Sequence, residues 1–377
     1  MKKLLVLLMA IFLYAEEMTF INPFESNTDT NKTEYNQSAS QTPALINSSE
    51  TNLSETNLSE TNETNETNTT EIQEVSFDDN FVTLQPKIKI AVLINKQKFF
   101  KFLPSIINSI NSYFLNKDAE FNLKVYPIDT NISQITKEGY KNIFVYSLNK
   151  EYIKNLSEYN DTYFYVPVFN KNDIDTNATN IYFGGIDYKS QTGKFVEYMD
   201  TNSGVAINDN TLLSQKLYNI EKEYNLSLIS YKFPNIDYND LNQSYLFLNI
   251  DAGKSAQVLS NITAKEIETK LVFAPQIDYN PLLIEITQPQ DVTKLLIANS
   301  IITVPTEIED TNLNLGSDIK YNWLNYATNV LLNKAYNKIT QNDEFYMNDF
   351  NLYIFNNQIN YKTKLYQIIN GAFKPIE

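Results

Sequence analysis

The sequence contains no cysteine, no histidine and no arginine, so all 30 of its positive charges are lysines. The absence of cysteine excludes a disulfide framework, thiolate zinc sites, a cysteine nucleophile and a lipid-bearing N-terminal cysteine. Without histidine, the chain lacks the commonest general base and transition-metal ligand. The absence of arginine removes the side chain best suited to clamp a carboxylate. We therefore expect neither a metal nor a cofactor.

Positive charge is also scarce relative to negative charge, because 45 acidic residues give a formal net charge of −15 at pH 7. Such an acidic chain repels nucleic acid and anionic membrane surfaces. Beyond the N-terminus, the sequence has no run of 18 apolar residues that could span a bilayer. The composition therefore predicts no nucleic-acid partner and no membrane insertion of the mature protein.

The first 15 residues have a basic start, an apolar run and a small residue before two acids. This is the layout of a secretory signal peptide, with cleavage expected after Ala15. Leu13 stands where a small residue is preferred, so an uncleaved anchor is the alternative, although the apolar run is short for one. We expect export across the inner membrane to the periplasm, as a protein that is not a lipoprotein.

Residues 16–84 differ sharply in composition from the rest of the chain. Asn, Thr, Ser and Glu dominate, and the unit SETNL is written twice before shorter SETN and ETN units follow. Such a segment cannot bury enough apolar surface to offset the loss of chain entropy, so it is predicted to be disordered. It serves either as a stalk or as a solvated tail without a role.

Beyond residue 84, apolar strands alternate with amphipathic helices. In the first half we predict a helix at residues 99–115 and strands at residues 87–93, 123–128, 143–146 and 163–169. In the second half we predict helices at residues 212–223, 254–263 and 281–287, and strands at residues 226–231, 245–250, 271–273 and 295–298. A helix at residues 322–339 and a hairpin at residues 351–369 complete the chain. This alternation indicates parallel sheets with helices on both faces.

The stretch from residue 181 to 208 connects the two halves. A short strand ends in Gly184-Gly185, a helix follows at residues 189–199, and a second strand covers residues 205–207. Strand, helix and strand form one βαβ unit. Because this unit lies where one α/β half ends and the other begins, we interpret it as a hinge.

Two successive Rossmann-like lobes, the GGID hinge at residues 184–187 and a late helix resemble the type I periplasmic-binding-protein fold. The C-terminal phrase YKTKLYQIINGAFKPI resembles the ending of its penicillin-binding-protein activator branch. The resemblance covers residues 87–377, and another doubly wound α/β protein is the alternative. It implies an α/β fold of two lobes with parallel sheets joined by a hinge. Their expected ranges are residues 85–200 plus 305–340 for lobe 1, 201–304 for lobe 2, and 341–377 for a C-terminal hairpin near the hinge.

Two short motifs suggest catalysis but lack their supporting elements. Residues 251–255, DAGKS, resemble the end of a P-loop, yet Leu248 stands where its first glycine is required. Ser147 and Lys150 match the S-x-x-K pair of penicillin-recognising enzymes, but the S-D-N and K-T-G elements are absent. A hydrolase that uses paired carboxylates remains an alternative, although no pair of acids is distinguished by its spacing.

Polar residues that follow the predicted strands are candidates for a ligand-binding cleft, since ligands bind beyond the carboxyl ends of strands in open α/β sheets. Each of them is also an ordinary cap or turn residue. They are Asn95, Ser147, Asn170 and Asp187 from the first lobe, and Asn208, Asp251 and Gln276 from the second.

The resemblance implies a non-catalytic periplasmic binding or scaffold protein. Because the chain has no arginine to bind the carboxylate of a small ligand, an envelope protein partner such as a cell-wall synthase is favoured. The stalk would allow the protein to extend to such a partner. The alternative is a solute-binding component of a transport or sensing system that takes a small polar ligand.

The pentapeptide acid-x-Asn-x-Ser/Thr, which one type of bacterial oligosaccharyltransferase modifies, occurs twelve times, although chance placement would yield about one match. We therefore predict N-glycosylation by such an oligosaccharyltransferase, with ordinary turns as the alternative. The twelve sites are Asn31, Asn36, Asn52, Asn57, Asn62, Asn65, Asn68, Asn131, Asn160, Asn177, Asn225 and Asn242.

Overall fold

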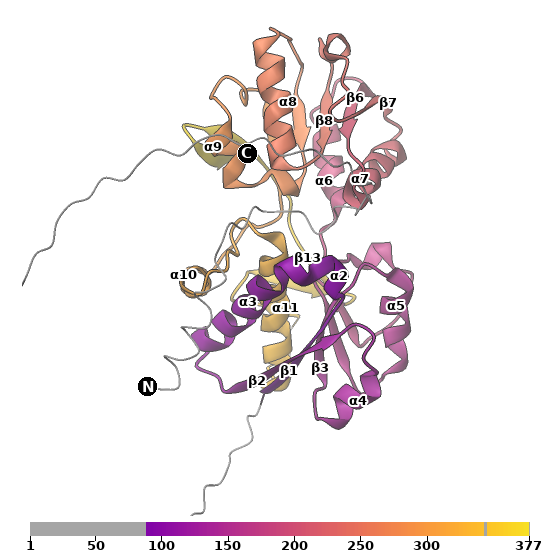
Figure 1. The fold of residues 1–377 in the computed structure, drawn as a ribbon, viewed down its shortest axis with the longest axis vertical. Coiled ribbons are helices and arrows are strands. Elements are labelled where there is room, and N and C mark those ends of the chain that lie inside the picture. The colour runs from indigo at the N-terminus through magenta and orange to yellow at the C-terminus, as the bar shows by residue number, and fades with distance from the viewer. Residues whose placement is uncertain (1–87, 343–344, 377) are drawn as a thin grey trace, which may run out of the picture. The chain divides into compact units, whose positions relative to one another are not determined.

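The computed structural model describes residues 88–342 and 345–376 (Figure 1). Their strands form an eight-stranded sheet in the order β11-β12-β13-β5-β4-β3-β1-β2 and a seven-stranded sheet in the order β15-β14-β10-β9-β8-β6-β7. We call the first sheet with its helices lobe 1 and the second with its helices lobe 2. The predicted signal peptide and stalk, residues 1–15 and 16–84, lie outside the described residues.

Lobe 1 begins with five parallel strands. They are β1 (Ile88–Ile94), β2 (Phe121–Pro127), β3 (Asn142–Tyr146), β4 (Tyr163–Val166) and β5 (Ile181–Phe183), and the helices between them are α2 (Lys96–Phe99), α3 (Leu103–Asn116), α4 (Ile132–Lys137) and α5 (Lys150–Asn155). In β1, Ile90 and Val92 belong to one core cluster while Ala91 and Leu93 belong to another. Successive side chains therefore bury both faces of the sheet, as expected for parallel strands between helices.

Lobe 2 repeats this arrangement. Its parallel strands are β6 (Ser203–Asn208), β7 (Ser227–Lys232), β8 (Leu246–Asn249), β9 (Val272–Ala274) and β10 (Leu295–Asn299), and its helices are α6 (Tyr188–Val196), α7 (Leu212–Glu223), α8 (Ala252–Ala264) and α9 (Pro281–Ile286). Leu246 and Leu248 of β8 pack in one core cluster and Phe247 in another. The predicted class, two α/β lobes, is confirmed, although the strands are mostly parallel rather than wholly parallel as expected.

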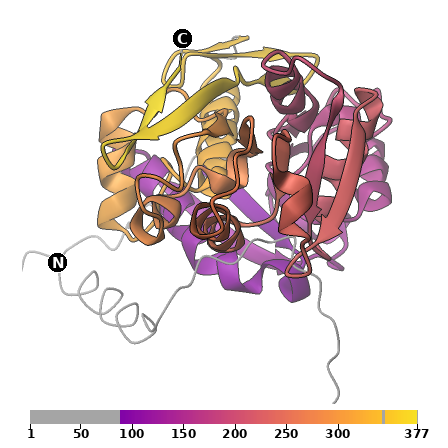
Figure 2. The ribbon, with the colours of Figure 1, turned by 90° about the horizontal axis from the view of Figure 1, so that it is seen from above.

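The C-terminal part returns to lobe 1 and is then divided between the lobes. Seen from above, its yellow strands lie together along the top of the view (Figure 2). Helices α10 (Thr306–Asn314) and α11 (Trp323–Ile339) pack against α3. The first sheet is extended by β11 (Tyr346–Met347), β12 (Leu352–Phe355) and β13 (Gln358–Asn360), and the second by β14 (Lys364–Ile369) and β15 (Ala372–Pro375). The single hairpin predicted at residues 351–369 is therefore wrong, and antiparallel pairs make both sheets mixed.

The connection near the hinge also differs from its predicted range. Helix α6 contacts α7 and β10, and its Phe195 packs with Phe247 and Phe273 in the core of lobe 2. Residues 188–196 thus lie on lobe 2, although lobe 1 was expected to extend to residue 200. The physical reason is that the chain leaves the first sheet at Phe183, the last residue of β5.

Asparagine and aspartate begin many of these helices, which suits a chain rich in both. The Asn95, Asp187 and Asp251 side chains accept hydrogen bonds from the first turns of α2, α6 and α8. Within residues 88–342 and 345–376, no helix has both the length and the apolar content needed to cross a membrane.

Candidate functional site

A pocket with a cavity volume of about 190 Å³ lies between the lobes. Phe102, Val168 and Trp323 contribute to its wall from lobe 1, and Tyr188 and Leu213 from lobe 2. The wall is mostly apolar and aromatic. Of the described residues that line it, Asp251 alone carries a charge at neutral pH, and none is a lysine.

Trp323 is held at the pocket by the start of helix α11. Asn322 caps this helix, with its Oδ1 accepting from the Asn325 N–H at 3.2 Å. The indole packs against Tyr361 and Tyr326, with ring centroids 4.7 and 5.7 Å apart. Since it is the only tryptophan of the chain, its fluorescence reports on this pocket.

Gln276 forms a polar part of the wall, but its side chain is already occupied. Its Nε2 donates to Asn299 Oδ1 at 2.8 Å, and its Oε1 accepts from the Ser300 N–H at 2.6 Å. Gln191 of α6 accepts from the Gln276 backbone N–H and donates to Ser300 Oγ. This buried network shapes the pocket and leaves the Gln276 amide little capacity to bind a ligand.

The charge of Asp251 is balanced inside the protein. Its carboxylate caps α8 and lies 2.6 Å from Lys254 Nζ, which also lies 2.9 Å from Asp209 Oδ2. Burial alone would raise the pKa of Asp209, but hydrogen bonds from Thr211 and Lys254 outweigh it and lower that pKa. Lys254, which lies beside the pocket residue Asp251, is thus engaged by two carboxylates, and the described residues that line the pocket present no positive charge to an acidic ligand.

Two acids of lobe 2 are buried but do not line the pocket. Burial raises the pKa of Asp278 well above its usual range, and an interaction with the nearby Ser255 hydroxyl offsets only part of this shift. Burial raises the pKa of Glu221 to about 8, partly offset by a hydrogen bond with Asn249. Both side chains are therefore expected to be mainly protonated at neutral pH.

The structure brings two of the seven predicted cleft residues, Asp251 and Gln276, into this pocket. Asn95 caps α2, Ser147 Oγ accepts from the Asn149 N–H, and Asn208 bonds to Ser230 and Asn249. The other two, Asn170 and Asp187, lie at the hinge. Sequence reasoning missed the apolar wall, for which a single tryptophan at the start of a late helix was the one available signal.

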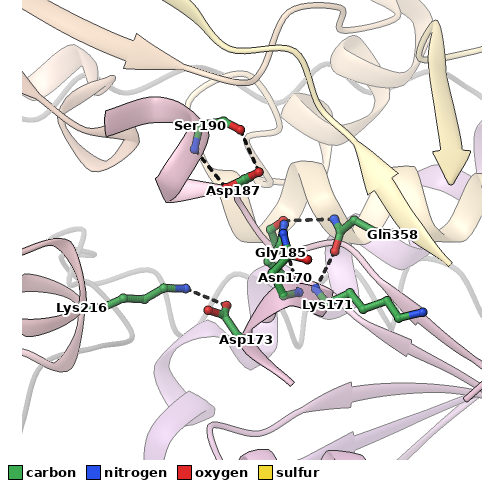
Figure 3. A network of polar contacts seen from close by, with 9 residues as sticks. Asn170, Lys171, Asp173, Gly185, Asp187, Ser190, Lys216 and Gln358 are labelled. Atoms are coloured by element: carbon green, nitrogen blue, oxygen red, sulfur yellow. Dashed lines mark hydrogen bonds and ion pairs between the residues drawn. The ribbon is translucent and has the colours of Figure 1, made fainter. Parts of the chain in front are cut away.

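Two hydrogen bonds at the hinge meet at the backbone carbonyl oxygen of Gly185 (Figure 3). The Gly185 oxygen accepts from Asn170 Nδ2 at 3.3 Å and from Gln358 Nε2 at 3.4 Å. Gln358 Oε1 in turn accepts from the Lys171 N–H at 2.7 Å. Strand β13 near the C-terminus therefore fixes the point where the chain leaves lobe 1.

An ion pair joins the two lobes beside the hinge (Figure 3). Lys216 on α7 of lobe 2 lies with its Nζ 2.6 Å from Oδ2 of Asp173, in the 3₁₀ turn Lys171–Asp173 of lobe 1. The same Nζ lies 5.3 Å from the ring centroid of Tyr188, which lines the pocket. The pair is partly shielded from solvent and favours the arrangement of the lobes in this structure.

We predict that Lys216→Met loosens this arrangement and lets the lobes open further. Loss of a partly buried ion pair costs about 1 kcal/mol, which is roughly a fivefold shift towards open lobes. Small-angle X-ray scattering of the ligand-free protein should show a larger radius of gyration, and high salt should enlarge the wild type similarly. Lys189→Met is the matched control, because it removes an exposed pair with Glu223 within lobe 2. Equal scattering of both variants and the wild type would contradict the prediction.

The arrangement of the two lobes is similar to that of solved periplasmic binding proteins, so the predicted type I periplasmic-binding-protein-like fold is confirmed. A branched-chain amino acid ABC transporter structure from Thermus thermophilus with bound valine matches at 12% identity and a TM-score of 0.55, covering 77% of this chain and 95% of that chain. LpoA of Haemophilus influenzae matches at 14% identity and a TM-score of 0.53, covering 79% of this chain and 60% of LpoA.

A solute-binding protein from R. palustris in complex with 4-hydroxybenzoate matches at 10% identity and a TM-score of 0.55, covering 77% of this chain and 96% of that chain. At such identities the likeness shows the fold alone. No protein-family model matches the chain, and no curated protein sequence matches it significantly.

Proposed function

We propose that the chain is a non-catalytic periplasmic binding protein whose interlobe pocket takes a small, uncharged and largely apolar ligand. The observation that carries the proposal is the wall of the pocket, which is aromatic and aliphatic and offers no free cation. Solved structures that resemble the chain include a solute-binding protein with bound 4-hydroxybenzoate, a branched-chain amino acid ABC transporter with bound valine, and LpoA. A non-catalytic role also suits a pocket lined by one carboxylate rather than a pair.

The cavity volume limits the size of the ligand. An apolar cavity of about 150 Å³ in another protein holds benzene. A volume of about 190 Å³ therefore suits a single ring, or a branched aliphatic group, with one or two substituents. The valine and 4-hydroxybenzoate of the similar structures are of this size but carry carboxylates, which this pocket is not equipped to neutralise. The ligand is thus less polar than the sequence suggested.

We predict that neutral compounds of this size, but not the matching carboxylates, change the emission of Trp323 saturably. A ligand at 100 times its Kd should also stabilise the fold by about 2.7 kcal/mol, seen as a higher Tm. Leu282→Ala removes a pocket-lining side chain and should weaken binding by about tenfold or less, since a few buried methyl groups are lost.

Ile286→Ala on the same helix is the matched control, because Ile286 is exposed and does not line the pocket. It should leave the affinity unchanged. Tighter binding of carboxylates, or equal effects of the two substitutions, would argue against the proposed ligand.

A second candidate is a scaffold or regulator of an envelope protein complex such as a cell-wall synthase. It is favoured by the similarity to LpoA and by the C-terminal phrase, which forms β14 and β15 at the edge of the second sheet. The predicted stalk, residues 16–84, would provide reach to such a partner. Crosslinking in the envelope followed by mass spectrometry tests this function, and Leu282→Ala should leave the crosslinks intact if the pocket plays no part.

A further inference from the structure

Five of the twelve acid-x-Asn-x-Ser/Thr pentapeptides lie within the described residues, and the other seven lie outside them. The asparagines of all five, at positions 131, 160, 177, 225 and 242, are exposed. Exposure of the asparagine alone is not sufficient, because a transferase must also reach the acid two residues before it and the hydroxyl two residues after it. The five sites differ in this respect.

The pentapeptide around Asn177 is accessible at all three recognised positions. Asp175, Asn177 and Thr179 are exposed, and residues 175–178 belong to no helix or strand. Both ends of the loop are anchored in lobe 1. Ile174 is buried before it, and Asn180 is buried after it, with its Nδ2 donating to the carbonyl oxygens of Tyr159 at 3.0 Å and Thr162 at 3.1 Å. A hydrogen bond from Asn357 Nδ2 to the Ala178 carbonyl oxygen, at 3.3 Å, ties the loop to lobe 1 but does not involve the Asn177 side chain. The acceptor thus stands on an exposed loop outside the core.

At the other four sites, regular structure or burial obstructs the pentapeptide. Thr162, the hydroxyl residue that follows Asn160, is only 2% exposed. The pentapeptide of Asn131 enters helix α4, and that of Asn225 enters strand β7. Asn242 uses its Oδ1 to accept from the Glu268 N–H at 3.3 Å, and the preceding Leu241 is fully buried.

We propose that Asn177 is an N-glycan acceptor that remains accessible after the chain has folded. In the transfer, the amide nitrogen of Asn177 forms a bond to the anomeric carbon of an oligosaccharide carried on a polyprenyl diphosphate. The bond from that carbon to the diphosphate oxygen breaks, the lipid diphosphate leaves with the electron pair, and the amide nitrogen loses one proton to a base of the transferase. No oxidant or reductant is required.

A glycan at Asn177 is compatible with the proposed binding function and independent of it. Asn177 does not line the interlobe pocket, and its loop precedes β5, whereas Asp251 and Gln276 of the pocket follow the carboxyl ends of β8 and β9. The amide that carries the sugar makes no contact that holds the two lobes together. Modification should therefore leave ligand binding unchanged.

The test incubates the folded, full-length mature chain with a bacterial oligosaccharyltransferase specific for the acidic pentapeptide and its lipid-linked oligosaccharide. Cleavage after lysine yields a peptide of residues 172–189, in which Asn177 is the one candidate site. We expect this peptide to carry the glycan mass. The variants Asn177→Gln, Thr179→Ala and Asp175→Ala should each lose it completely, while their unchanged Tm shows that the fold is intact.

The chain offers two internal controls. Asn202 is exposed and follows an acid at the same spacing, but Gly204 replaces the hydroxyl residue, so peptide 195–216 should stay unmodified. Asn160, in peptide 155–171, should be modified in a synthetic peptide but not in the folded chain. The proposal is overturned if peptide 172–189 stays unmodified while the synthetic Asn160 peptide is accepted, or if the folded chain accepts Asn160 and Asn177 equally.

Discussion

Replacing Gly185 with alanine should destabilise the protein by about 3 kcal/mol or more. A Cβ at this position would lie 2.1 Å from the Phe169 carbonyl carbon and 2.4 Å from the Asn170 nitrogen. Both are backbone atoms, so no side-chain rotation can relieve the overlap. The substitution would also displace the Gly185 carbonyl from its hydrogen bonds with Asn170 and Gln358. The unfolding midpoint in urea, followed by circular dichroism, measures the loss.

Gly253→Ala is the control for this experiment. Gly253 lies in helix α8, and a Cβ there would approach only Asp251 Oδ1, at 3.4 Å. Alanine in a helix is favoured over glycine by up to about 1 kcal/mol, so this variant should be as stable as the wild type or slightly more stable. If both alanine variants had the same unfolding midpoint, the close packing at Gly185 would not limit stability.

Glu221→Gln should make the protein more stable at high pH but not at low pH. The unfolded chain releases the Glu221 proton near pH 4.5, whereas burial raises the pKa of this carboxyl group in the folded protein to about 8. Below pH 4.5 both states hold the proton and the residue has no effect. Between pH 4.5 and 8 the folded state alone retains it, so wild-type stability falls as the pH rises. At about 1.4 kcal/mol per pKa unit, the loss reaches at most about 5 kcal/mol above pH 8.

The glutamine variant lacks this titration, so its free energy of unfolding should exceed that of the wild type by an amount that grows from pH 4.5 to 8. The free-energy cost of burying the amide in the variant is the same at every pH, so it does not change how the difference in stability varies with pH. Glu223→Gln, on the same helix but exposed, is the matched control. Parallel stability curves of the wild type and Glu221→Gln across this range would show that Glu221 is ionised in the folded protein.

Most of the regular structure was predictable because its signals are local. Helix α7 begins at Leu212 and ends at Glu223, as predicted, since Thr211 caps it and leucine and isoleucine recur at helical spacing on its buried face. Helix α10 was missed because few of its residues are apolar and a proline precedes it. The division of the C-terminal strands was missed because pairing partners far apart in the sequence leave no periodic pattern near them.

The site was less predictable than the fold. Asp251 and Gln276 follow strands in lobe 2, so the topology of an open α/β sheet places them at the cleft. Phe102 and Trp323 reach the same pocket from helices separated by most of the described chain. Each looks like an ordinary core residue in its own segment, and only their meeting in space defines the wall.

Strand β13 is synthesised long after its neighbour β5, and this order affects how the nascent protein folds. Strand β5 ends at Phe183, and its outer neighbour in the sheet, β13, begins at Gln358, so the outer edge of β5 stays unpaired until residue 358 has been synthesised. Contacts between such distant segments form slowly, and an open edge leaves strand pairing incomplete. This order also means that a truncation after Ile339 would leave both sheets incomplete at once.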